Sequence, residues 1–582
     1  MTTRRRAEMT AWQKRLVAEL KALAEENADD VKISRQPKLQ NDRDVELRIR
    51  LRTAAIPRLT SGLDLLDHEE FILRLPSAPF RPPSVAVDHV RFLGHPHVLM
   101  GQHPCVYLDP SREWHPQSGM GGFLNRLWDW LTDAAGGKFD PATAMYHAVG
   151  GVLHLTDGTP TIVVREAGPV RARQVATLIT RTEQRCDLTY TTGREGLKAP
   201  VFTLATDMPF GAATTFADLL KLLDDPYLEA SGGRPPRVAP QSPAFLTTLL
   251  TSAVRNPRDT HQYFVLAVPH PAGGPSHLLC GRLPTDTANA LRAIAGRYGT
   301  TINLDPAEIK TDIPIEWCAV SDERQAVTTR RDDTRPVNGF QDKSVFIWGC
   351  GGLGSWVAEF IMRAGAGEIA LCDPARITGG LLVRQNYVED DIGQSKAHAL
   401  QSRLEAICDT TAVKVASDPP DESTLLATDL VLDATISHAV TTYLDALSMT
   451  PGRKATIVQV ATDPRTGTLG IANVCAPDST MTPSEVDQHA GVRATSDGTL
   501  ELYHPLWRDV AEADELVPTR GCSVPTFHGS AADLAAVAAS LTSLVGSHLG
   551  TSSPSMSGTH LIALPHAGDG PAHRFLEATQ TA

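Results

Sequence analysis

The sequence predicts a multidomain α/β protein, and three patterns along its 582 residues indicate that fold class. Near the N-terminus, an amphipathic helix, alternating strands and a second helix predict an α+β domain. Near the C-terminus, an apolar strand runs into a glycine-rich loop and a helix, which is typical of a parallel sheet with helical crossovers. Short apolar runs between them predict a middle α/β domain. We therefore expect domains over residues 1–140, 141–320 and 321–582.

The composition excludes several classes of function. The formal charge of −13 argues against nucleic acid as the main partner, because phosphate backbones need a basic surface. The nine cysteines include no C-x-x-C pair, and no signal peptide is evident, so we expect reduced thiols and a cytoplasmic protein. No stretch looks long and apolar enough to span a bilayer, and we expect no membrane partner.

The first predicted domain begins with a helix. Its apolar residues recur at helical spacing: Trp12, Leu16, Leu20 and Leu23. Residues 45–52 alternate apolar and charged side chains, which predicts a half-buried strand. Residues 68–75 and 84–92 resemble two more strands, and residues 123–131 carry the apolar stripe of a second helix. Asp140-Pro141 marks the expected boundary.

The middle region carries weaker patterns. Residues 161–164 and 264–268 predict strands, and residues 287–297 predict a helix. Residues 231–243 are rich in glycine and proline, which favours a loop. Residues 321–343 are charged and polar, and we expect a solvated linker there.

The C-terminal region carries the strongest motif. An apolar strand, residues 343–348, leads into a loop that contains Gly349, Gly351, Gly352 and Gly354. Glycines let the backbone approach a ligand, and the start of the following helix favours negative charge. A second strand, residues 369–372, ends in Asp373, and an acid at that place can bind a ribose hydroxyl. The pattern predicts a nucleotide site, but a nicotinamide-dependent dehydrogenase would look the same.

Three charged residues downstream separate the alternatives. Arg384 and Lys396 follow the second strand, and Asp433 ends a third apolar strand. A dehydrogenase has no evident need for this set. Adenylation needs it, because a carboxylate attacks the α-phosphate and cations neutralise the developing charge. A carboxylate such as Asp433 can also hold Mg²⁺.

Residues 343–447 resemble the ThiF/MoeB/E1 family of ATP-dependent activating enzymes. The shared motifs occur in the family's order: G-x-G-G-L-G-S, R-A-G-x-G, V-R-Q, D-I-G-x-x-K and D-L-V-x-D-A-T. The resemblance implies a Rossmann-like adenylation domain in which Asp373 holds the ribose, Arg384 and Lys396 serve the phosphates, and Asp433 serves Mg²⁺. It also implies ATP as a substrate and frequent homodimers. Ala375 and Leu381 depart from the family pattern, and the family's zinc-binding cysteine pairs are absent, so we expect no structural zinc.

Cys522 lies after the long polar stretch 477–514 and before an alanine-rich helix that we expect to start near Ser530. An exposed thiol beside Arg520 and close to a helix start would have a lowered pKa. Its placement resembles the transfer cysteine of E1-type enzymes, whereas the alternative is an inert buried residue. We expect Cys350 and Cys372 to be small packing residues.

The N-terminal domain carries a second candidate cysteine. The proline-rich segment 75–85 is followed by His95-Pro96-His97, by Cys105 and by Trp114. Such dense prolines fit a rigid turn at a sheet edge. The order P-x-x-P-F-x-P-P, H-P-x, C, W-x-P resembles ubiquitin-conjugating (E2, or UBC) domains, which implies that Cys105 carries an activated protein as a thioester. His97 stands where that family has asparagine. The alternative is a surface loop with a chance cysteine.

The whole chain resembles the fused E2–E1 enzymes of bacterial antiphage (CBASS) operons. There, the enzyme attaches the C-terminus of a cGAS-like nucleotidyltransferase to target proteins. The resemblance implies three steps: adenylation of a partner's C-terminus with ATP and Mg²⁺, thioester formation at Cys522, and transfer through Cys105 to a lysine amine.

Three alternatives remain open. The partner could be a bacterial ubiquitin-like protein instead. A sulfur-carrier activator would need no E2 module, and the proline-rich segment with Cys105 argues against it. A catalytically inactive scaffold that binds a nucleotidyltransferase is a third alternative, and the retained charged residues and cysteines argue against it.

Overall fold

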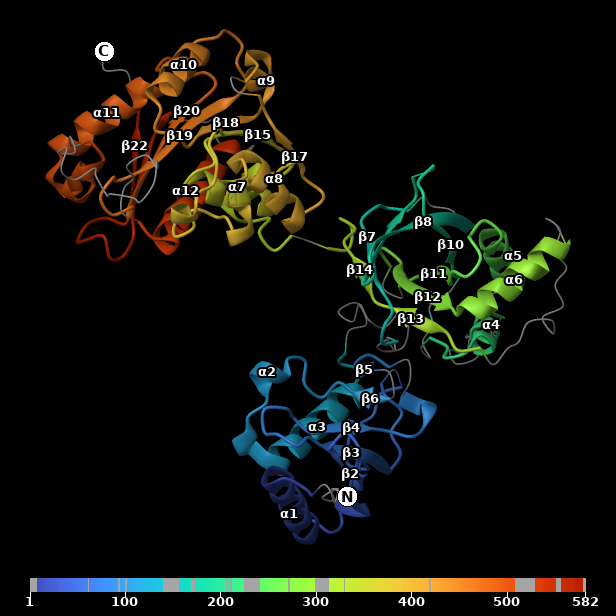
Figure 1. The fold of residues 1–582 in the computed structure, drawn as a ribbon. Coiled ribbons are helices and arrows are strands. Elements are labelled where there is room, and N and C mark those ends of the chain that lie inside the picture. Colours follow the sequence, from blue (N-terminus) through green and yellow to red (C-terminus); the bar gives the residue numbers. More distant parts are fainter. Residues whose placement is uncertain are drawn as a thin grey trace, which may run out of the picture. The chain divides into compact units, whose positions relative to one another are not determined.

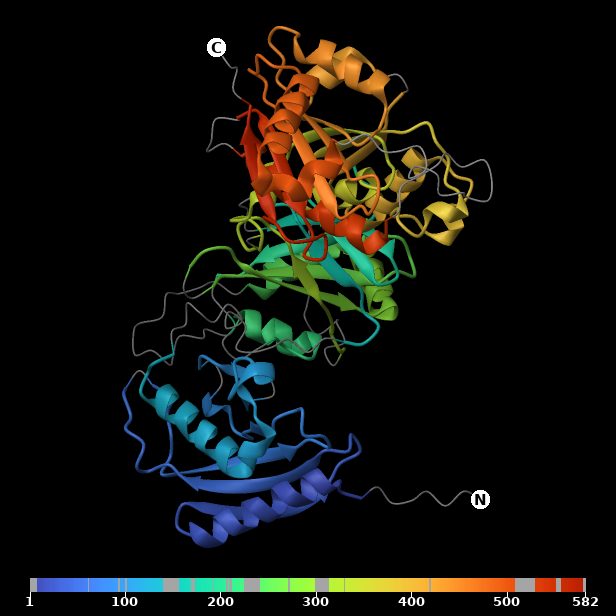
Figure 2. The same cartoon turned by 90° about the vertical axis from the view of Figure 1, so that its left-hand side faces the viewer.

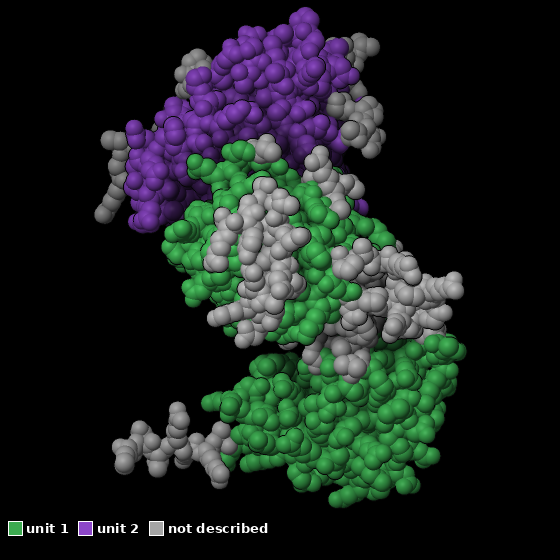
Figure 3. Space-filling model, turned by 90° about the vertical axis from the view of Figure 1, so that its right-hand side faces the viewer, with its two compact units in different colours: residues 1–329 green, residues 330–582 purple. Residues whose placement is uncertain are grey.

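The computed structural model describes residues 8–60, 62–92, 95–99, 102–139, 156–168, 173–191, 193–205, 208, 212–224, 241–270, 273–298, 313–328, 330–417, 420–507, 529–550 and 556–578. The chain forms two compact units, residues 1–329 and 330–582, which Figure 3 colours separately. Each unit is described by itself.

The first part of unit 1 is an α+β fold (Figures 1 and 2). Four antiparallel strands lie in the order β1-β2-β3-β4, with bounds Val31–Leu39, Val45–Arg52, His68–Leu75 and Ser84–Ala86. Helices α1 (Ala11–Glu26) and α3 (Gly119–Ala135) bury one apolar stripe each against the inward residues of these strands. The alternation of apolar and charged residues in β2 places Leu47 and Ile49 in the core and leaves Arg50 exposed.

Short elements connect β4 to α3. They are η1 (Val90–Phe92), the two-stranded sheet β5 (Val98–Leu99) with β6 (His103–Pro104), α2 (Pro110–Glu113) and η2 (Pro116–Ser118). The expected strand at residues 84–92 is therefore too long, since β4 ends at Ala86 and a 3-10 turn takes the rest. Strand β1 was not predicted, because most of its side chains are polar and exposed.

The second part of unit 1 contains an eight-stranded sheet that closes on itself (Figure 1). Its strands are β7 (Thr161–Val164), β8 (Arg173–Thr182), β9 (Arg185–Thr189), β10 (Leu197–Thr203), β11 (Gln262–Val268), β12 (His277–Leu283), β13 (Glu316–Cys318) and β14 (Val320–Asp322). β13 pairs with β12 at one edge, and β14 pairs with β7 at the other. Only Ala319 separates these two strands in the chain, so one segment joins both edges and closes a barrel.

Helices cover one side of this barrel. They are α4 (Phe216–Asp224), α5 (Ser242–Ala253) and α6 (Thr285–Tyr298). In β11, Phe264 and Leu266 face these helices, whereas Tyr263 and Val265 belong to the inner cluster. The predicted strands at residues 161–164 and 264–268 and the predicted helix at 287–297 are confirmed. The expected linker at residues 321–343 is partly wrong, because β14 reaches Asp322 and spans the expected boundary at residue 320.

Unit 2 is a doubly wound α/β fold (Figure 1). Its sheet has the order β17-β16-β15-β18-β19-β20-β21-β22, and the first five strands are parallel. Their bounds are β15 Ser344–Trp348, β16 Glu368–Cys372, β17 Ala412–Val415, β18 Leu430–Asp433 and β19 Thr456–Thr462. The antiparallel extension is β20 Leu469–Cys475, β21 Gly558–Ala563 and β22 His573–Glu577.

Helices cover both faces of this sheet. One face packs against α7 (Gly354–Arg363), α8 (Lys396–Ile407) and α12 (Ala531–Leu549), and the other against α9 (Glu422–Ala427) and α10 (His438–Ser448). α11 (Pro483–Ser496) and η10 (Gly498–Leu506) cover the antiparallel extension. The remaining 3-10 turns are η7 (Pro336–Phe340), η8 (Gly379–Leu381) and η9 (Glu389–Asp391).

The polar stretch 477–514, for which no element was predicted, contains α11 and η10. One expectation for unit 2 needs correction. Helix α12 begins after Ser530 as predicted, but by length and composition it is apolar enough to cross a membrane, which contradicts the expectation that no such segment exists. In the structure, Leu534, Val537 and Leu541 of α12 are buried in the core of unit 2.

Candidate functional site

The parallel strands of unit 2 bring the predicted nucleotide residues to one edge of the sheet. Trp348, the last residue of β15, pairs with Cys372 of β16 and with Asp433 of β18. Gly349 and Asp373 follow directly, so the glycine loop begins between two carboxylates at the carboxyl ends of three strands. β16 and β18 lie on opposite sides of β15. Ligands of doubly wound sheets bind at such a switch point.

The structure explains differently why glycine stands at each position of the loop. Gly349 has a φ of 91°, which a residue with a side chain rarely adopts. A Cβ at Gly354 would lie 1.8 Å from the Gly349 carbonyl oxygen, so helix α7 approaches the loop too closely for any side chain. A Cβ at Gly351 would meet nothing within 4 Å. Gly352 is half-buried beside it. Open space therefore lies next to Gly351, where the backbone could approach a phosphate.

Asp373 anchors the loop. One carboxylate oxygen accepts a 2.8 Å hydrogen bond from the Cys350 N–H, and the other accepts one of 2.8 Å from the Ala375 N–H. Each carboxylate oxygen has a second lone pair, so the group can also accept a hydroxyl. The side chain is half-buried.

Asp433 is buried at the end of β18. Its Oδ1 accepts from the N–H and the hydroxyl of Thr435, and its Oδ2 accepts from the Gln459 amide at 3.1 Å. Burial raises the pKa of this carboxyl above its ordinary value, although those hydrogen bonds oppose the rise. A nearby cation would restore the charged form, which is the behaviour expected of a carboxylate that meets a metal ion.

The two predicted cations come from the β16–α8 connection. Arg384 is buried, its carbonyl accepts the Trp356 indole N–H at 3.2 Å, and burial lowers the pKa of its guanidinium. Lys396 is the first residue of α8, and its backbone N–H donates to the Ala375 carbonyl at 3.0 Å. Among the described residues, its half-buried ammonium has no hydrogen-bond or ion-pair partner.

The charges and the open space of this site fit a nucleoside triphosphate. Within the described ranges, the buried amide oxygen of Gln385 has no hydrogen-bond partner, which is unusual for a buried polar atom. It follows Arg384 directly. The same unit contains the open space beside Gly351 and the Lys396 ammonium, which has no partner among the described residues. No cluster of three or more acids, histidines or cysteines able to hold a metal occurs in the described parts of the chain. Mg²⁺ does not need one, because one or two carboxylates with phosphates and waters suffice. Asp433 could fill that role.

Sequence reasoning missed the residues that hold this site together. Asn386 and Tyr387, directly after Arg384-Gln385, are both buried and hydrogen-bonded to the glycine loop or to α7. Ser355 and Glu359 of α7 are buried as well. No periodicity marks such residues, although polar side chains next to a V-R-Q motif were a usable signal. Cys350 and Cys372 are buried, as predicted.

In unit 1, Cys105 lies just after the short strand β6. Its thiol is half-buried and donates to the Tyr107 carbonyl at 3.4 Å, and its backbone N–H donates to the His97 carbonyl at 2.7 Å. Burial raises the pKa of this thiol, and the Glu113 carboxylate adds to the rise. Tyr107, whose carbonyl accepts the thiol hydrogen bond, lines a groove of about 530 Å³, and Cys105 is not itself a lining residue. The other lining residues are Glu113, Trp114, His115, Ser118, Gly122, Asn125, Arg126 and Asp129.

The proline-rich segment and the H-P-H turn both lie near this cysteine. Trp114 is buried, its indole N–H donates to the Pro79 carbonyl at 2.8 Å, and its ring lies 6.0 Å from that of Tyr107. His97 adopts a left-handed φ of 63°, and its ring lies 4.7 Å from the Phe139 ring. The structure thus brings together the motifs that sequence reasoning grouped with Cys105.

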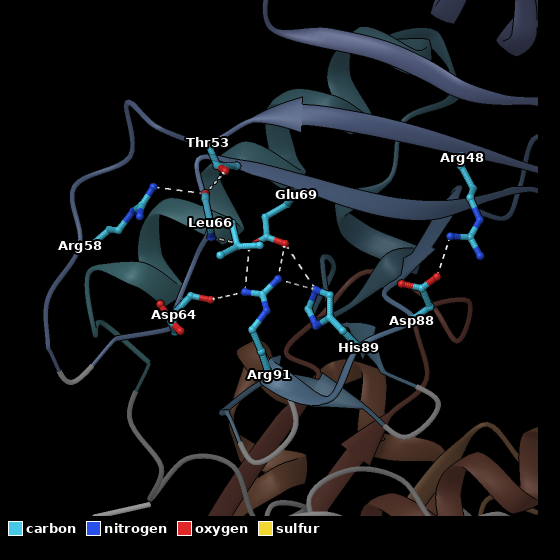
Figure 4. A network of polar contacts seen from close by, with 9 residues as sticks. All are labelled: Arg48, Thr53, Arg58, Asp64, Leu66, Glu69, Asp88, His89 and Arg91. Atoms are coloured by element: carbon cyan, nitrogen blue, oxygen red, sulfur yellow. Dashed lines mark hydrogen bonds and ion pairs between the residues drawn. The ribbon is translucent and has the colours of Figure 1, made fainter.

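A buried carboxylate anchors the chain ahead of the H-P-H turn (Figure 4). Glu69 accepts from the Leu66 N–H at 2.7 Å and from both terminal nitrogens of Arg91, and His89 approaches it at 3.4 Å. Arg91 also donates to the Asp64 carbonyl at 2.8 Å. The network fixes Arg91 of η1, four residues before His95. Cys522 lies outside the described residues.

Family models match three successive regions of the chain. They are the prokaryotic E2 family A over residues 20–149, the Cap2 central linker domain over residues 195–323 and the ThiF family over residues 332–496.

Individual relatives match parts of the chain. The ATP-dependent ubiquitin transferase-like protein Cap2 of Enterobacter hormaechei subsp. hoffmannii (strain UCI 50) is 31% identical over 139 residues, which are 23% of each protein. Molybdopterin-synthase adenylyltransferase of Escherichia coli (strain K12) is 32% identical over 18% of this chain and 45% of that protein. Among solved structures, E. coli MccB with ATP has a TM-score of 0.29 and 17% identity, over 42% of this chain and 66% of that chain.

The chain spans about a quarter of the length of the Cap2 relative and under half of the adenylyltransferase. The order of the matched regions confirms the predicted fold class, an E2-like domain, a linker domain and a Rossmann-like ThiF domain. The chain is therefore similar to Cap2 in containing, in this order, regions that match the prokaryotic E2 family A, the Cap2 central linker domain and the ThiF family.

Proposed function

We propose that this protein is an ATP-dependent conjugating enzyme that combines E1-like activation and E2-like transfer in one chain. The carrying observation is the edge of the unit 2 sheet, where the glycine loop lies between Asp373 and Asp433. Cys105, whose thiol contacts the groove residue Tyr107, supplies the second reactive group in the same chain. The Cap2 relative is named an ATP-dependent ubiquitin transferase-like protein, which supports the same activity here.

The first step joins a partner protein to AMP. The partner's C-terminal carboxylate attacks the α-phosphorus of ATP, and pyrophosphate leaves. Arg384 and Lys396 neutralise the charge that develops on the phosphates, and Asp433 would hold Mg²⁺, which would supply further positive charge there. Asp373 accepts the ribose hydroxyl. Because hydrogen bonds hold the Asp373 and Asp433 carboxylates before ATP arrives, these two groups cost little reorganisation in the transition state.

The later steps are thiol chemistry. The Cys522 thiolate attacks the acyl-adenylate and releases AMP, and the Cys105 thiolate then takes the acyl group from Cys522. A lysine amine of the target then attacks this second thioester. The attack forms an amide between the lysine and the partner's C-terminus and releases the Cys105 thiol. Since burial raises the pKa of the Cys105 thiol, most of it is protonated at neutral pH, and acyl transfer requires loss of that proton.

The partner that we propose is a cGAS-like nucleotidyltransferase in antiphage defence, with a lysine-bearing protein as target. A bacterial ubiquitin-like protein is the alternative partner. We also propose a cytoplasmic location and a homodimer. We propose three domains, of which the first covers residues 1–140, and the middle one extends past the expected boundary at residue 320 because β14 ends at Asp322.

Pyrophosphate exchange into ATP, measured with the candidate partner present because its C-terminal carboxylate forms the adenylate, tests the activation step. Arg384→Ala and Asp433→Ala should each lower the exchange rate by about 10²–10³-fold, because one preorganised charge contributes roughly 3–4 kcal/mol. Matched controls are Arg493→Ala and Asp478→Ala, exposed residues of unit 2 remote in sequence from the motifs. Wild-type exchange in Arg384→Ala or Asp433→Ala would contradict the assignment, and a wild-type chain without exchange would favour the inactive scaffold.

Cys522→Ala tests the order of the thioesters. This variant should still support exchange but should charge neither cysteine with the partner, which non-reducing gels would show. Charging of Cys105 in Cys522→Ala would mean that acyl transfer bypasses Cys522.

A further inference from the structure

We propose that Asn386 and Tyr387 are a positioning pair that holds Arg384 and Lys396 against the glycine loop. The proposal deepens the adenylation function proposed above and rests on it. The two residues follow Arg384-Gln385 in the connection between β16 and α8. This connection crosses the carboxyl edge outside the sheet ladders, so side-chain hydrogen bonds must fix its course.

Tyr387 joins the glycine loop to the start of α8. Its buried hydroxyl lies 2.7 Å from the Cys350 carbonyl and 3.3 Å from the Lys396 carbonyl. Burial raises the pKa of this phenol far above its ordinary value, so the hydroxyl remains a donor at any working pH. One proton thus serves a carbonyl in the loop and the carbonyl of the residue whose ammonium would meet the phosphates.

Asn386 joins the same connection to α7 and, through Ser355, to Gly351. The Asn386 backbone N–H donates to the Ser355 hydroxyl at 3.1 Å, and that hydroxyl donates to the Gly351 carbonyl at 2.7 Å. The Asn386 side-chain amide donates to Glu359 at 2.7 Å. Gly351 is the glycine beside open space, so this relay ends where a phosphate would lie.

Glu359 anchors the pair through hydrogen bonds and ion pairs. It is buried, and besides Asn386 it binds Arg363 of its own helix and Arg403 of α8, at 2.8 and 3.1 Å. Burial would raise the pKa of its carboxyl, but Asn386, Arg363 and Arg403 outweigh that effect and lower it. An ionised Glu359 therefore connects α7, the Arg384 connection and α8, the three segments that present the proposed phosphate-binding groups.

The pair acts through other residues because its polar groups are already used. The Tyr387 hydroxyl donates to two carbonyls, and the buried Asn386 side chain donates to Glu359, so we assign neither of them a direct phosphate contact. Small displacements of charged groups in a transition state can cost about 10²-fold in rate. Loosening the pair should therefore slow adenylation while the fold persists.

The test compares Tyr387→Phe with Tyr503→Phe. Tyr503 is a matched control, because it is also fully buried in unit 2 and its hydroxyl donates to a backbone carbonyl, that of Pro571. Tyr387→Phe should lower kcat of pyrophosphate exchange by about 10- to 100-fold with a smaller change in KM for ATP. Tyr503→Phe should retain the wild-type kcat, and both variants should melt at similar temperatures.

A double-mutant comparison separates positioning from general softening. If Tyr387 acts through Lys396, adding Tyr387→Phe to Lys396→Ala should change the residual kcat by no more than about twofold. The full 10- to 100-fold loss in that background overturns the positioning of Lys396 by Tyr387. Equal kcat in Tyr387→Phe and Tyr503→Phe overturns the positioning role as a whole.

ATP binding by the full-length variants distinguishes failure of the proposed adenylation from failure of the positioning role. A wild-type chain that binds ATP but does not exchange pyrophosphate overturns adenylation. In that case weaker ATP binding by Tyr387→Phe than by Tyr503→Phe supports positioning of the binding groups, and equal binding overturns it. A wild-type chain that neither exchanges nor binds ATP overturns both proposals.

Discussion

The backbone N–H of Cys105 donates a 2.7 Å hydrogen bond to the backbone carbonyl of His97. This bond ties the proposed transfer cysteine to the turn formed by His95-Pro96-His97. His97 lies in the left-handed region, with a φ of 63°, where asparagine and glycine are favoured over most residues. Position 97 therefore demands a backbone conformation that the asparagine of related E2 domains would also satisfy.

We expect His97→Asn to retain charging of Cys105, because asparagine adopts the left-handed conformation readily. His97→Val should lose about 1–2 kcal/mol of folding free energy and much of the charging, since a β-branched residue is strained there. Non-reducing gels with ATP and partner would measure charging. Equal charging in the two variants would show that the backbone conformation is not what matters, and loss in His97→Asn would point to the imidazole.

The glycine loop offers a test that separates fold from ligand binding. Gly351→Ala should leave the melting temperature unchanged, because its Cβ would meet nothing within 4 Å, yet it should raise KM for ATP by filling the space beside the loop. Gly354→Ala should destabilise unit 2, because its Cβ would lie 1.8 Å from a carbonyl oxygen. Unchanged ATP binding in Gly351→Ala would mean that the phosphates lie elsewhere.

The Glu69 network should stabilise the N-terminal domain more than an exposed ion pair does (Figure 4). Glu69→Gln should cost about 2 kcal/mol, because it removes a buried charge that binds Arg91 through two nitrogens. Asp88→Asn is the matched control, because the Asp88 side chain is 52% exposed and its pair with Arg48 should contribute at most about 1 kcal/mol. Hydrogen exchange in β2 and β3 measures both, and equal effects would contradict the role of burial.

Unit 2 should lose stability in mild acid because of a histidine chain. His560 Nε2 lies 2.7 Å from His548 Nε2, and His560 Nδ1 lies 3.1 Å from His573 Nε2. Burial, together with the two neighbouring histidines, lowers the pKa of His560 from 6.5 to about 3. Between these values the unfolded chain binds a proton that the folded chain does not. The stability is therefore full above pH 6.5 and falls as the pH decreases, by about 2 kcal/mol between pH 7 and pH 5.

His560→Leu should remove most of that pH dependence, although it also changes packing at a single pH. His398→Leu, on an exposed position of α8, should keep the wild-type dependence. Thermal unfolding of the full chain at pH 7 and pH 5 compares them. The same loss in acid for both variants would place the responsible proton on another group.

The sequence was most informative where one short motif or one periodic face determines the structure. Helix α1, strands β2 and β3 and the β15–loop–α7 turn were predicted with nearly the observed bounds. In each, burial of one face or the steric requirement for a glycine produces a recognisable local sequence pattern. The same reasoning placed Gly349, Asp373 and Asp433 at strand ends, and the register confirms that these lie side by side.

The elements that were not predicted have weaker local sequence patterns. Helix α11 buries Val486, Ala490 and Ala494, residues too small or too few for an evident apolar stripe. Its capping box, Thr482 with Glu485, was the available signal. Barrel closure by β13 and β14 depends on pairing between distant segments, which no local pattern encodes. The Asn386–Tyr387 pair was missed for the same reason, because its hydrogen bonds join segments distant in the sequence.

Cys105 distinguishes a conjugating enzyme from a mere activator, because an activator could stop at Cys522. The most direct measurement incubates the full-length chain with ATP, Mg²⁺ and the candidate partner and follows lysine conjugates by denaturing gel and mass spectrometry. Cys105→Ala should leave Cys522 charged and form no conjugate, and Cys105→Ser should trap a reductant-resistant ester at position 105 with the partner's C-terminal peptide. Undiminished lysine conjugates from Cys105→Ala would contradict transfer through the E2-like domain.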